Sequence, residues 1–249
     1  MPADGAMGRL DDLAECAVGA ALPFDKLALF DFDGTLVNYD TVNPFIRYVL
    51  RKHPELNVEP DRSLPHKQYR LKLLAGLSRD ELFELGRGFY EKEIKPHLIA
   101  ESMGELIRLR DAGYHVCVCS GSYDPYLRHF CAEYGVDTLI CTWVGYEDGV
   151  CTGLFGKLDC LGENKLELLR EEFGTCDFTG FDSRAFSDAQ SDIPLLDTCA
   201  QAFVMVPSDR QPAEWIGAKE YPVIPYAMKK RTRLWRKLKW LTRRALRID

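Results

Sequence analysis

The chain has 249 residues, of which 46% are hydrophobic and 28% charged, a balance that excludes a disordered or fibrous protein. No stretch approaches the roughly 18 apolar residues of a membrane span, and the acidic first 20 residues lack the basic and apolar regions of a signal peptide, so we expect a cytoplasmic protein. The net charge is −6, and the nine cysteines have no zinc-ligand spacing, which fits a reducing compartment.

Residues 27–30 form a short apolar run that predicts a buried strand, ended by the turn signal Asp33-Gly34. Residues 40–98 have helical spacing of apolar residues and no strand signal, with a proline-containing loop at 53–66. We therefore expect a helical insertion directly after the first strand.

From residue 100 onward, helical and strand patterns alternate. Asp124, followed by a proline, is expected to cap a helix, and Asp148-Gly149 predicts a hairpin turn. The predicted helices are 100–112, 125–134, 165–173 and 193–199, and the predicted strands are 116–119, 139–144, 150–155, 183–186 and 202–206. Strands that alternate with helices predict an α/β fold with a doubly wound, mostly parallel Rossmann-like sheet, to which the hairpin is added. The expected parts are an α/β core (1–39 and 99–227), a small helical cap (40–98) and a basic amphipathic C-terminal tail (228–249).

Polar residues follow three of the predicted strands. Asp31 and Asp33 follow the first, Ser120 the second, and Asp188 with Asp192 a later one, while Lys165 opens a nearby helix. Ligands of such sheets bind beyond the carboxyl ends of the strands. Carboxylates there can hold a divalent cation, whereas a lysine and backbone amides bind phosphate. Each element alone could be an ordinary turn, loop or capped helix start; their joint order favours a catalytic site.

These motifs, in this order, resemble the haloacid dehalogenase superfamily, specifically its phosphoserine-phosphatase-like subgroup (subfamily IB). The resemblance extends over about residues 26–206 and rests on four segments: Asp31-Phe32-Asp33-Gly34-Thr35-Leu36-Val37, Val118-Cys119-Ser120-Gly121-Ser122, Gly162-Glu163-Asn164-Lys165 and Ser187-Asp188-Ala189-Gln190-Ser191-Asp192. The last segment departs from the Gly-Asp-Gly-x-Asn-Asp form usual in phosphoserine phosphatases, which puts fine contacts to phosphate in doubt.

The resemblance implies a magnesium-dependent phosphomonoesterase with an aspartyl-phosphate intermediate. Asp31 would be the nucleophile and Asp33 the general acid and base. The phosphoryl group would be held by Ser120, the Gly121 amide and Lys165. The Mg²⁺ ion would be held by Asp31, the Asp33 carbonyl and Asp188, with Asp192 in support. Two cap positions, Asp40 and Arg70, match residues that grip the amino and carboxylate groups of phosphoserine in the family.

The substrate expected from this resemblance is a small phosphorylated metabolite, for which a phosphoserine-like compound is one candidate. Apolar residues from Leu234 recur at steps of four and three in a run rich in Lys and Arg, which is typical of a helix on an anionic membrane surface. Such a tail would favour a membrane-peripheral phosphatase of a phospholipid monoester such as phosphatidylglycerophosphate. It could instead pack on the acidic body or on a partner. Nucleic acid is disfavoured because residues 1–228 carry a net charge of −15.

A third hypothesis, from another class, is a non-catalytic membrane-surface binding module that retains the fold. The intact set of Asp31, Asp33, Lys165 and Asp188 argues against it.

Overall fold

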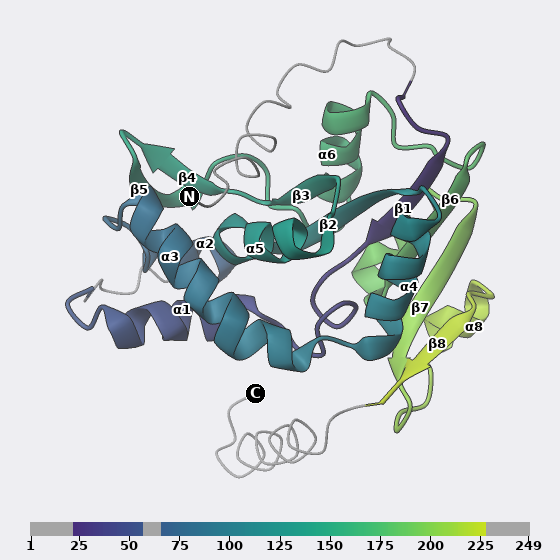
Figure 1. Cartoon of the computed structure of the whole chain (residues 1–249), viewed down its shortest axis with the longest axis horizontal. Coiled ribbons are helices and arrows are strands. Elements are labelled where there is room, and N and C mark those ends of the chain that lie inside the picture. Colours follow the sequence, from purple (N-terminus) through teal and green to yellow (C-terminus); the bar gives the residue numbers. More distant parts are fainter. Residues whose placement is uncertain (1–21, 57–65, 228–249) are drawn as a thin grey trace, which may run out of the picture.

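The computed structural model describes residues 22–56 and 66–227 (Figure 1). Its main sheet has six strands in the order β3-β2-β1-β6-β7-β8, and every pairing is parallel. The strands are β1 (Lys26–Phe30), β2 (His115–Tyr123), β3 (Thr138–Thr142), β6 (Asp182–Ser187), β7 (Gln201–Pro207) and β8 (Val223–Tyr226). The strand order reverses between β1 and β6, and a crevice at the carboxyl ends of these two strands is where such sheets bind ligands.

Helices cover both faces of the sheet because side chains of each strand alternate between the faces (Figure 1). In β1, Ala28 and Phe30 join the apolar cluster that contains residues of α4 and α5. Leu27 and Leu29 join the cluster that contains residues of α6, α7 and α8. These helices are α4 (Ala100–Asp111), α5 (Asp124–Tyr134), α6 (Asn164–Phe173), α7 (Ile193–Leu196) and α8 (Glu214–Ala218). The predicted doubly wound α/β fold is confirmed.

The described part of residues 40–98 is helical, and its apolar residues merge with the sheet's own core. It contains α1 (Val42–Lys52), α2 (His66–Lys72), α3 (Arg79–Phe89), the π-helical turn η1 (Tyr90–Ile94) and the 3₁₀ turn η2 (Lys95–His97). Phe45 and Phe89 pack on Tyr126 of α5 and belong to the same cluster as β1 and β2. A Cβ at Gly86 would lie 2.0 Å from the carbonyl oxygen of Pro125, so only glycine lets α3 sit directly on the start of α5.

The expected hairpin is present, but its first strand is shorter than predicted. β4 (Val144–Glu147) and β5 (Val150–Phe155) pair antiparallel around Asp148-Gly149, whose φ angles are 48° and 76°. The predicted strand 139–144 is therefore two elements, because its first part is β3 of the main sheet. Helix α2 lies against β5, where a Cβ at Gly153 would come within 2.8 Å of the Cα of Lys72.

Several other expectations need correction. Strand β2 continues through Ser120 to Tyr123 with an irregular register, so Ser120 lies inside the strand rather than after it. Helix α5 begins at Asp124 with Tyr123 in the capping position, and the Asp124 carboxylate instead accepts a hydrogen bond from the Val144 N–H (2.8 Å). The helix expected to reach residue 199 ends at Leu196 after a short 3₁₀ turn, η3 (Gln190–Asp192). Elements α8 and β8 were not predicted.

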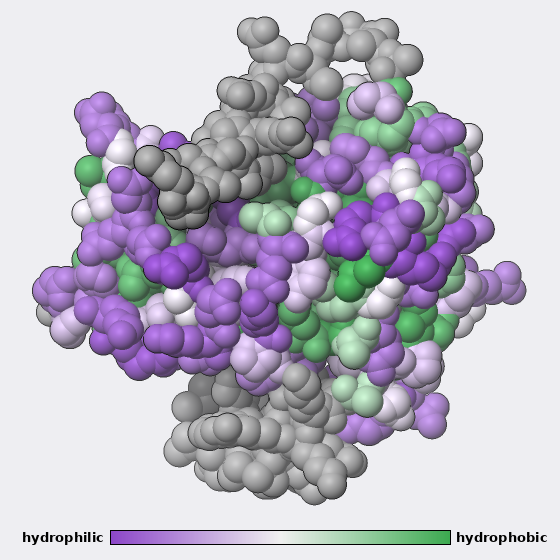
Figure 2. All heavy atoms as spheres, viewed as in Figure 1, coloured by the Kyte–Doolittle hydropathy of each residue, from purple (hydrophilic) through white to green (hydrophobic). Residues whose placement is uncertain are grey.

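The surface in Figure 2 is mostly hydrophilic, and apolar residues appear there in small groups. None of the helices in the described ranges is long and apolar enough to cross a membrane. The expected basic amphipathic tail at 228–249, and with it any contact with an anionic membrane, lies outside the described residues.

Candidate active site

Strand β1 delivers Asp31 to the crevice between β1 and β6. The Asp31 N–H donates to the Phe186 carbonyl oxygen (2.9 Å), which continues the pairing of β1 with β6 by one residue. The Asp31 side chain is buried, and this burial raises its pKa to about 6, although the neighbouring Lys165 opposes the rise. A carboxylate at the switch point of a parallel sheet is thus held away from bulk water.

Lys165 connects the carboxylates of Asp31 and Asp192. It lies in the first turn of α6, is 1% exposed, and donates from Nζ to Asp31 Oδ1 (2.9 Å) and to Asp192 Oδ2 (2.8 Å). Burial works against its positive charge, but Asp31 and Asp192 hold the pKa of the ammonium well above its usual value. Ser187 donates from Oγ to Asp192 Oδ2 (2.7 Å) and so orients this acid.

Asp33 accepts three hydrogen bonds. Its Oδ1 accepts from the Thr41 hydroxyl (2.7 Å), and its Oδ2 accepts from the Thr41 N–H (3.0 Å) and the Ser122 hydroxyl (2.8 Å). The Thr41 hydroxyl also contacts the Tyr126 hydroxyl (2.9 Å), which links the carboxylate to α5. Burial raises the Asp33 pKa to about 7 despite the Thr41 N–H bond. The carboxyl group is therefore held in one orientation and can exist in either protonation state near neutral pH.

Asp188 meets the first motif at Gly34. A Cβ at Gly34 would lie 2.1 Å from Asp188 Oδ2, and the φ angle of Gly34 is +83°, so this position requires glycine twice over. Asp188 is an exposed residue, yet its carboxylate lies against the walls of the cavity. This desolvation, together with repulsion from Asp31 and Asp192, raises its pKa to about 7.

All nine residues expected at the site line one cavity of about 420 Å³. It is lined by Asp31, Asp33, Ser120, Gly121, Lys165, Asp188 and Asp192, by Asp40 and Arg70 from the helical segment 40–98, and also by Gly34, Tyr39, Val42, Lys67, Leu161, Ala189 and Ser191. Residues of all four motif segments and of the segment 40–98 thus line one cavity.

Sequence reasoning missed several residues of this site. Lys67 of α2 lines the cavity beside Gly121, Thr41 and Ser122 bind Asp33, and Tyr126 contacts Thr41. Ser122 belongs to the second motif segment, but no role was predicted for it. Lys67, Thr41 and Tyr126 have no distinctive signal, since a lysine on a helix and hydroxyl residues beside apolar ones occur on many ordinary segments.

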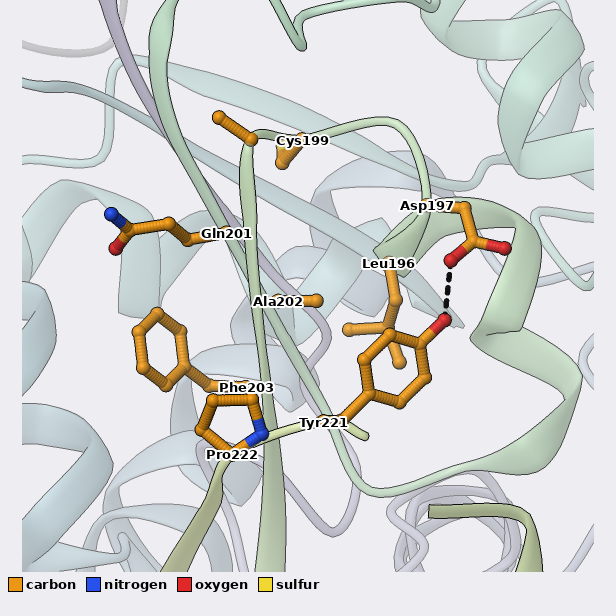
Figure 3. Close-up of a pocket in the computed structure, with 9 residues that line it drawn as sticks. Leu196, Asp197, Cys199, Gln201, Ala202, Phe203, Tyr221 and Pro222 are labelled. Atoms are coloured by element: carbon orange, nitrogen blue, oxygen red, sulfur yellow. Dashed lines mark hydrogen bonds between the residues drawn. The ribbon is translucent and has the colours of Figure 1, made fainter. Parts of the chain in front are cut away.

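A second cavity, of about 440 Å³, lies at the other end of the sheet, beside the first residues of β7 (Figure 3). Its acid, Asp197, is already bonded by the Tyr221 hydroxyl and by Lys219. It lies away from the carboxyl ends of the strands, where ligands of this fold bind, so we assign it no part in the chemistry.

The donor set of the first cavity fits a small, hard divalent cation. Within residues 22–56 and 66–227, no group of three or more His, Cys, Asp or Glu side chains is arranged to hold a metal ion. Two carboxylates, Asp31 and Asp188, and the Asp33 carbonyl remain, and Asp192 Oδ1 is buried without a hydrogen-bond partner. Mg²⁺ binds through one or two carboxylates and keeps several waters, so it needs no larger cage.

Comparison with known proteins gives the site its context. The sequence profile of the haloacid dehalogenase-like hydrolases matches residues 28–197, which is more than half of the chain. A histidinol-phosphatase of Neisseria meningitidis serogroup C is 25% identical over 81% of this chain and 99% of its own length. A phosphoserine phosphatase of Methanocaldococcus jannaschii is 29% identical over 51% of this chain and 60% of its own.

The fold recurs among solved structures. A protein of unknown function from Bordetella pertussis Tohama I superposes with a TM-score of 0.67 at 23% identity, over 80% of this chain and 98% of its own. At this level of identity, the likeness concerns the fold alone.

Proposed function

The chain belongs to the haloacid dehalogenase-like hydrolases, as a phosphatase of that family, and from this premise we propose that it hydrolyses a small phosphomonoester through an aspartyl-phosphate intermediate on Asp31. The observation that carries this proposal is the buried Asp31–Lys165–Asp192 network at the point where the strand order reverses. We take residues 40–98 as a cap over this site, because Asp40, Lys67 and Arg70 line the cavity from that side.

In the first step, Asp31 attacks phosphorus and the bond from phosphorus to the substrate's alcohol oxygen breaks. Lys165 holds Asp31 Oδ1, which leaves Oδ2 to attack. The ammonium of Lys165 also offsets negative charge on the phosphoryl oxygens, and Ser120 with the Gly121 N–H would bind these oxygens from β2. Such preorganised donors supply most of the rate enhancement in phosphoryl transfer.

Asp33 moves the protons in both steps. Its neutral form donates a proton to the leaving alcohol oxygen, and the resulting carboxylate then takes a proton from the water that attacks the aspartyl phosphate. This second step releases inorganic phosphate and restores the Asp31 carboxylate. A pKa of about 7 suits both roles, since neither protonation state is costly near neutral pH.

Mg²⁺ would be held by Asp31, the Asp33 carbonyl and Asp188, with Asp192 in support. When bound, the ion would neutralise charge on the transferred phosphoryl group. The support for this assignment is the excess of carboxylates over Lys165 and the unpartnered Asp192 Oδ1.

We further propose that the substrate carries an amine beside its phosphate. Asp40 is exposed in the cavity, with one oxygen accepting the Val42 N–H (3.1 Å), and would bind an ammonium group, while Arg70 would bind a carboxylate. Phosphoserine has both groups and histidinol phosphate only the amine. The phospholipid monoester that a membrane-binding tail would favour has no support among the described residues.

The test is phosphate release by the purified full-length chain, first from an aryl phosphate with and without Mg²⁺, then from a panel that includes phosphoserine and histidinol phosphate. Asp31→Asn is expected to lower kcat at least about 10³-fold, as loss of a nucleophile does. Asp148→Asn, in the exposed hairpin turn, is the matched control. Turnover retained by Asp31→Asn would show that the covalent mechanism is wrong. Turnover retained in EDTA would show that the proposed dependence on Mg²⁺ is wrong.

A further inference from the structure

Lys67 of α2 reaches from the cap to the core. Its Nζ forms an ion pair with Asp159 and donates to the Thr142 hydroxyl oxygen (3.1 Å). The Thr142 hydroxyl donates in turn to Asp159 Oδ1 (2.8 Å), and the Cys160 N–H donates to Thr142 Oγ1 (3.1 Å). This closed polar network ties the first turn of α2 to β3 and to the loop that follows β5.

A second bond ties the same residue to the core. The Tyr123 hydroxyl, at the end of β2, donates to the Lys67 carbonyl oxygen (3.3 Å). The side chain also passes over Gly121 of β2, since a Cβ there would lie 3.1 Å from Lys67 Nζ. Side chain and backbone of one residue therefore hold α2 against the elements that carry Ser120 and Gly121.

The ion pair between Lys67 and Asp159 is partly shielded from solvent and can therefore hold α2 in place. The side chains of Lys67 and Asp159 are 19% and 22% exposed, whereas ion pairs at the open surface contribute little. Arg70 lies three residues further along α2, about one helical turn, and lines the same cavity as Lys67. The position of Lys67 thus sets the position of Arg70.

We propose that Lys67 is a positioning residue, whose ion pair with Asp159 fixes α2 over Ser120 and Gly121 of β2 so that Arg70 faces the phosphate-bearing substrate. The role of Arg70 in substrate binding rests on the proposed function; the tie between α2 and the core does not. Direct binding of a substrate anion by Lys67 is the competing role. Two of the three Nζ donors serve Thr142 and Asp159, and the ion pair with Asp159 offsets the positive charge that would attract a substrate anion, so the positioning role is favoured.

The experiment measures KM and kcat of four variants of the full-length chain for a carboxylate-bearing substrate such as phosphoserine. Lys67→Met and Asp159→Asn should each raise KM about tenfold with a smaller change in kcat, and the double variant should be no worse than either single one, because both remove the same interaction. Lys67→Arg should restore most of the affinity. For an aryl phosphate, which offers Arg70 no carboxylate, KM should rise less.

A matched control is Lys72→Met, which removes a lysine from the same helix outside the cavity lining. If only the Lys67 substitutions raise KM, or if the effects of Lys67→Met and Asp159→Asn add, Lys67 binds substrate itself and the positioning role is wrong.

Hydrogen exchange of the amides in residues 66–77 separates this inference from the proposed function. Lys67→Met and Asp159→Asn should both speed exchange in this segment relative to Lys72→Met, whether or not any phosphomonoester is cleaved. Unchanged exchange in both variants would overturn the tie. Absence of phosphatase activity in the unaltered chain, with faster exchange in the variants, would overturn only the proposed function.

Discussion

At the scale of single residues, the site depends on Gly34, because any side chain there would collide with Asp188. Asp188 rests against the backbone of Gly34, so two motifs separated by more than 150 positions in the sequence meet without an intervening atom. The same glycine adopts a φ of +83°, which other residues reach only with strain. The sequence showed the Asp-Gly turn signal. It did not show that Asp188, from the last motif segment, also requires glycine at this position.

Gly34→Ala should therefore impair both stability and turnover. The positive φ alone costs about 1–2 kcal/mol for a residue with a Cβ, and the new methyl group would push away the Asp188 carboxylate. We expect a lower urea midpoint and a kcat reduced by at least about tenfold, measured on the same preparation.

The control for this substitution is Gly104→Ala in the middle of α4, where nothing lies within 4 Å of the added Cβ. It should stabilise the chain by roughly 0.5–1 kcal/mol and leave turnover unchanged, because alanine favours the helix. If Gly34→Ala behaves like Gly104→Ala, the close contact with Asp188 does not constrain the site.

At this scale, the residues that sequence reasoning identified share one property. Apart from Asp40 and Arg70, each lies near the carboxyl end of a strand or at the start of a helix that follows one, where position in the chain predicts position in the fold. Thr41 and Lys67 lie at the starts of α1 and α2, outside the strand-to-helix pattern, and their contacts depend on how residues 40–98 pack on the sheet.

At the scale of elements, Asp124 links helix α5 to strand β4. It is 2% exposed and accepts the Val144 N–H, and burial raises its pKa from 3.8 to about 6 although the Val144 N–H and Arg128 oppose the rise. Because the folded pKa is higher than the unfolded one, the folded state binds more protons between pH 4 and 6. The contribution of Asp124 to stability is thus full below about pH 4 and is lost as pH rises to about 6.

Asp124→Asn should remove this dependence while keeping an oxygen that accepts the Val144 N–H. The difference in free energy of unfolding between this variant and the unaltered chain should shift in favour of the variant by on the order of 2 kcal/mol as pH rises from 4 to 7. Urea unfolding at several pH values across this range measures the difference.

Asp177→Asn supplies a control of opposite sign, because hydrogen bonds from Thr179 lower the pKa of Asp177. Because the folded pKa lies below the unfolded value of 3.8, stability of this variant relative to the unaltered chain should fall as pH rises toward about 4 and change little between pH 4 and 7, so this arm of the measurement extends below pH 4. Equal pH profiles for the Asp124→Asn variant and the unaltered chain would show that Asp124 does not carry the effect.

Strands were predictable from the sequence where a segment has a single clear pattern, such as an apolar run. Strands β1 and β7 are largely apolar runs, whereas β8 contains Pro225 and lies at the sheet edge, where proline is tolerated but hides the strand signal. The run 139–144 reads as one strand because only Trp143 separates β3 from β4, and no residue there marks the change of sheet.

At the scale of the whole molecule, the cavity concentrates negative charge. Asp31 and Asp192 contact the buried ammonium of Lys165, and Asp33 and Asp188 line the same cavity at the carboxyl end of the sheet. A bound divalent cation would relieve this repulsion in the folded state alone, since the carboxylates are dispersed in the unfolded chain. The proposed metal site is therefore also a proposal about stability.

Mg²⁺ at ten times its dissociation constant should stabilise the fold by about 1.4 kcal/mol, which corresponds to a rise in Tm of roughly 3–6 °C for a chain of this size. Asp188→Asn should abolish most of the rise, as measured by thermal unfolding with Mg²⁺ or EDTA. Asp148→Asn, in the hairpin turn, should keep it. A full Mg²⁺ shift in the Asp188→Asn variant would place the ion elsewhere.

The strand order has a consequence for synthesis of the chain. Strand β1 is made first of the sheet, yet its neighbours β2 and β6 begin only at His115 and Asp182, and Asp192 comes later still. Lys165, which binds Asp31, follows it by 134 residues. A nascent chain that has not reached residue 192 therefore lacks part of the network that we propose as the reaction centre, and its Asp31 should be inactive.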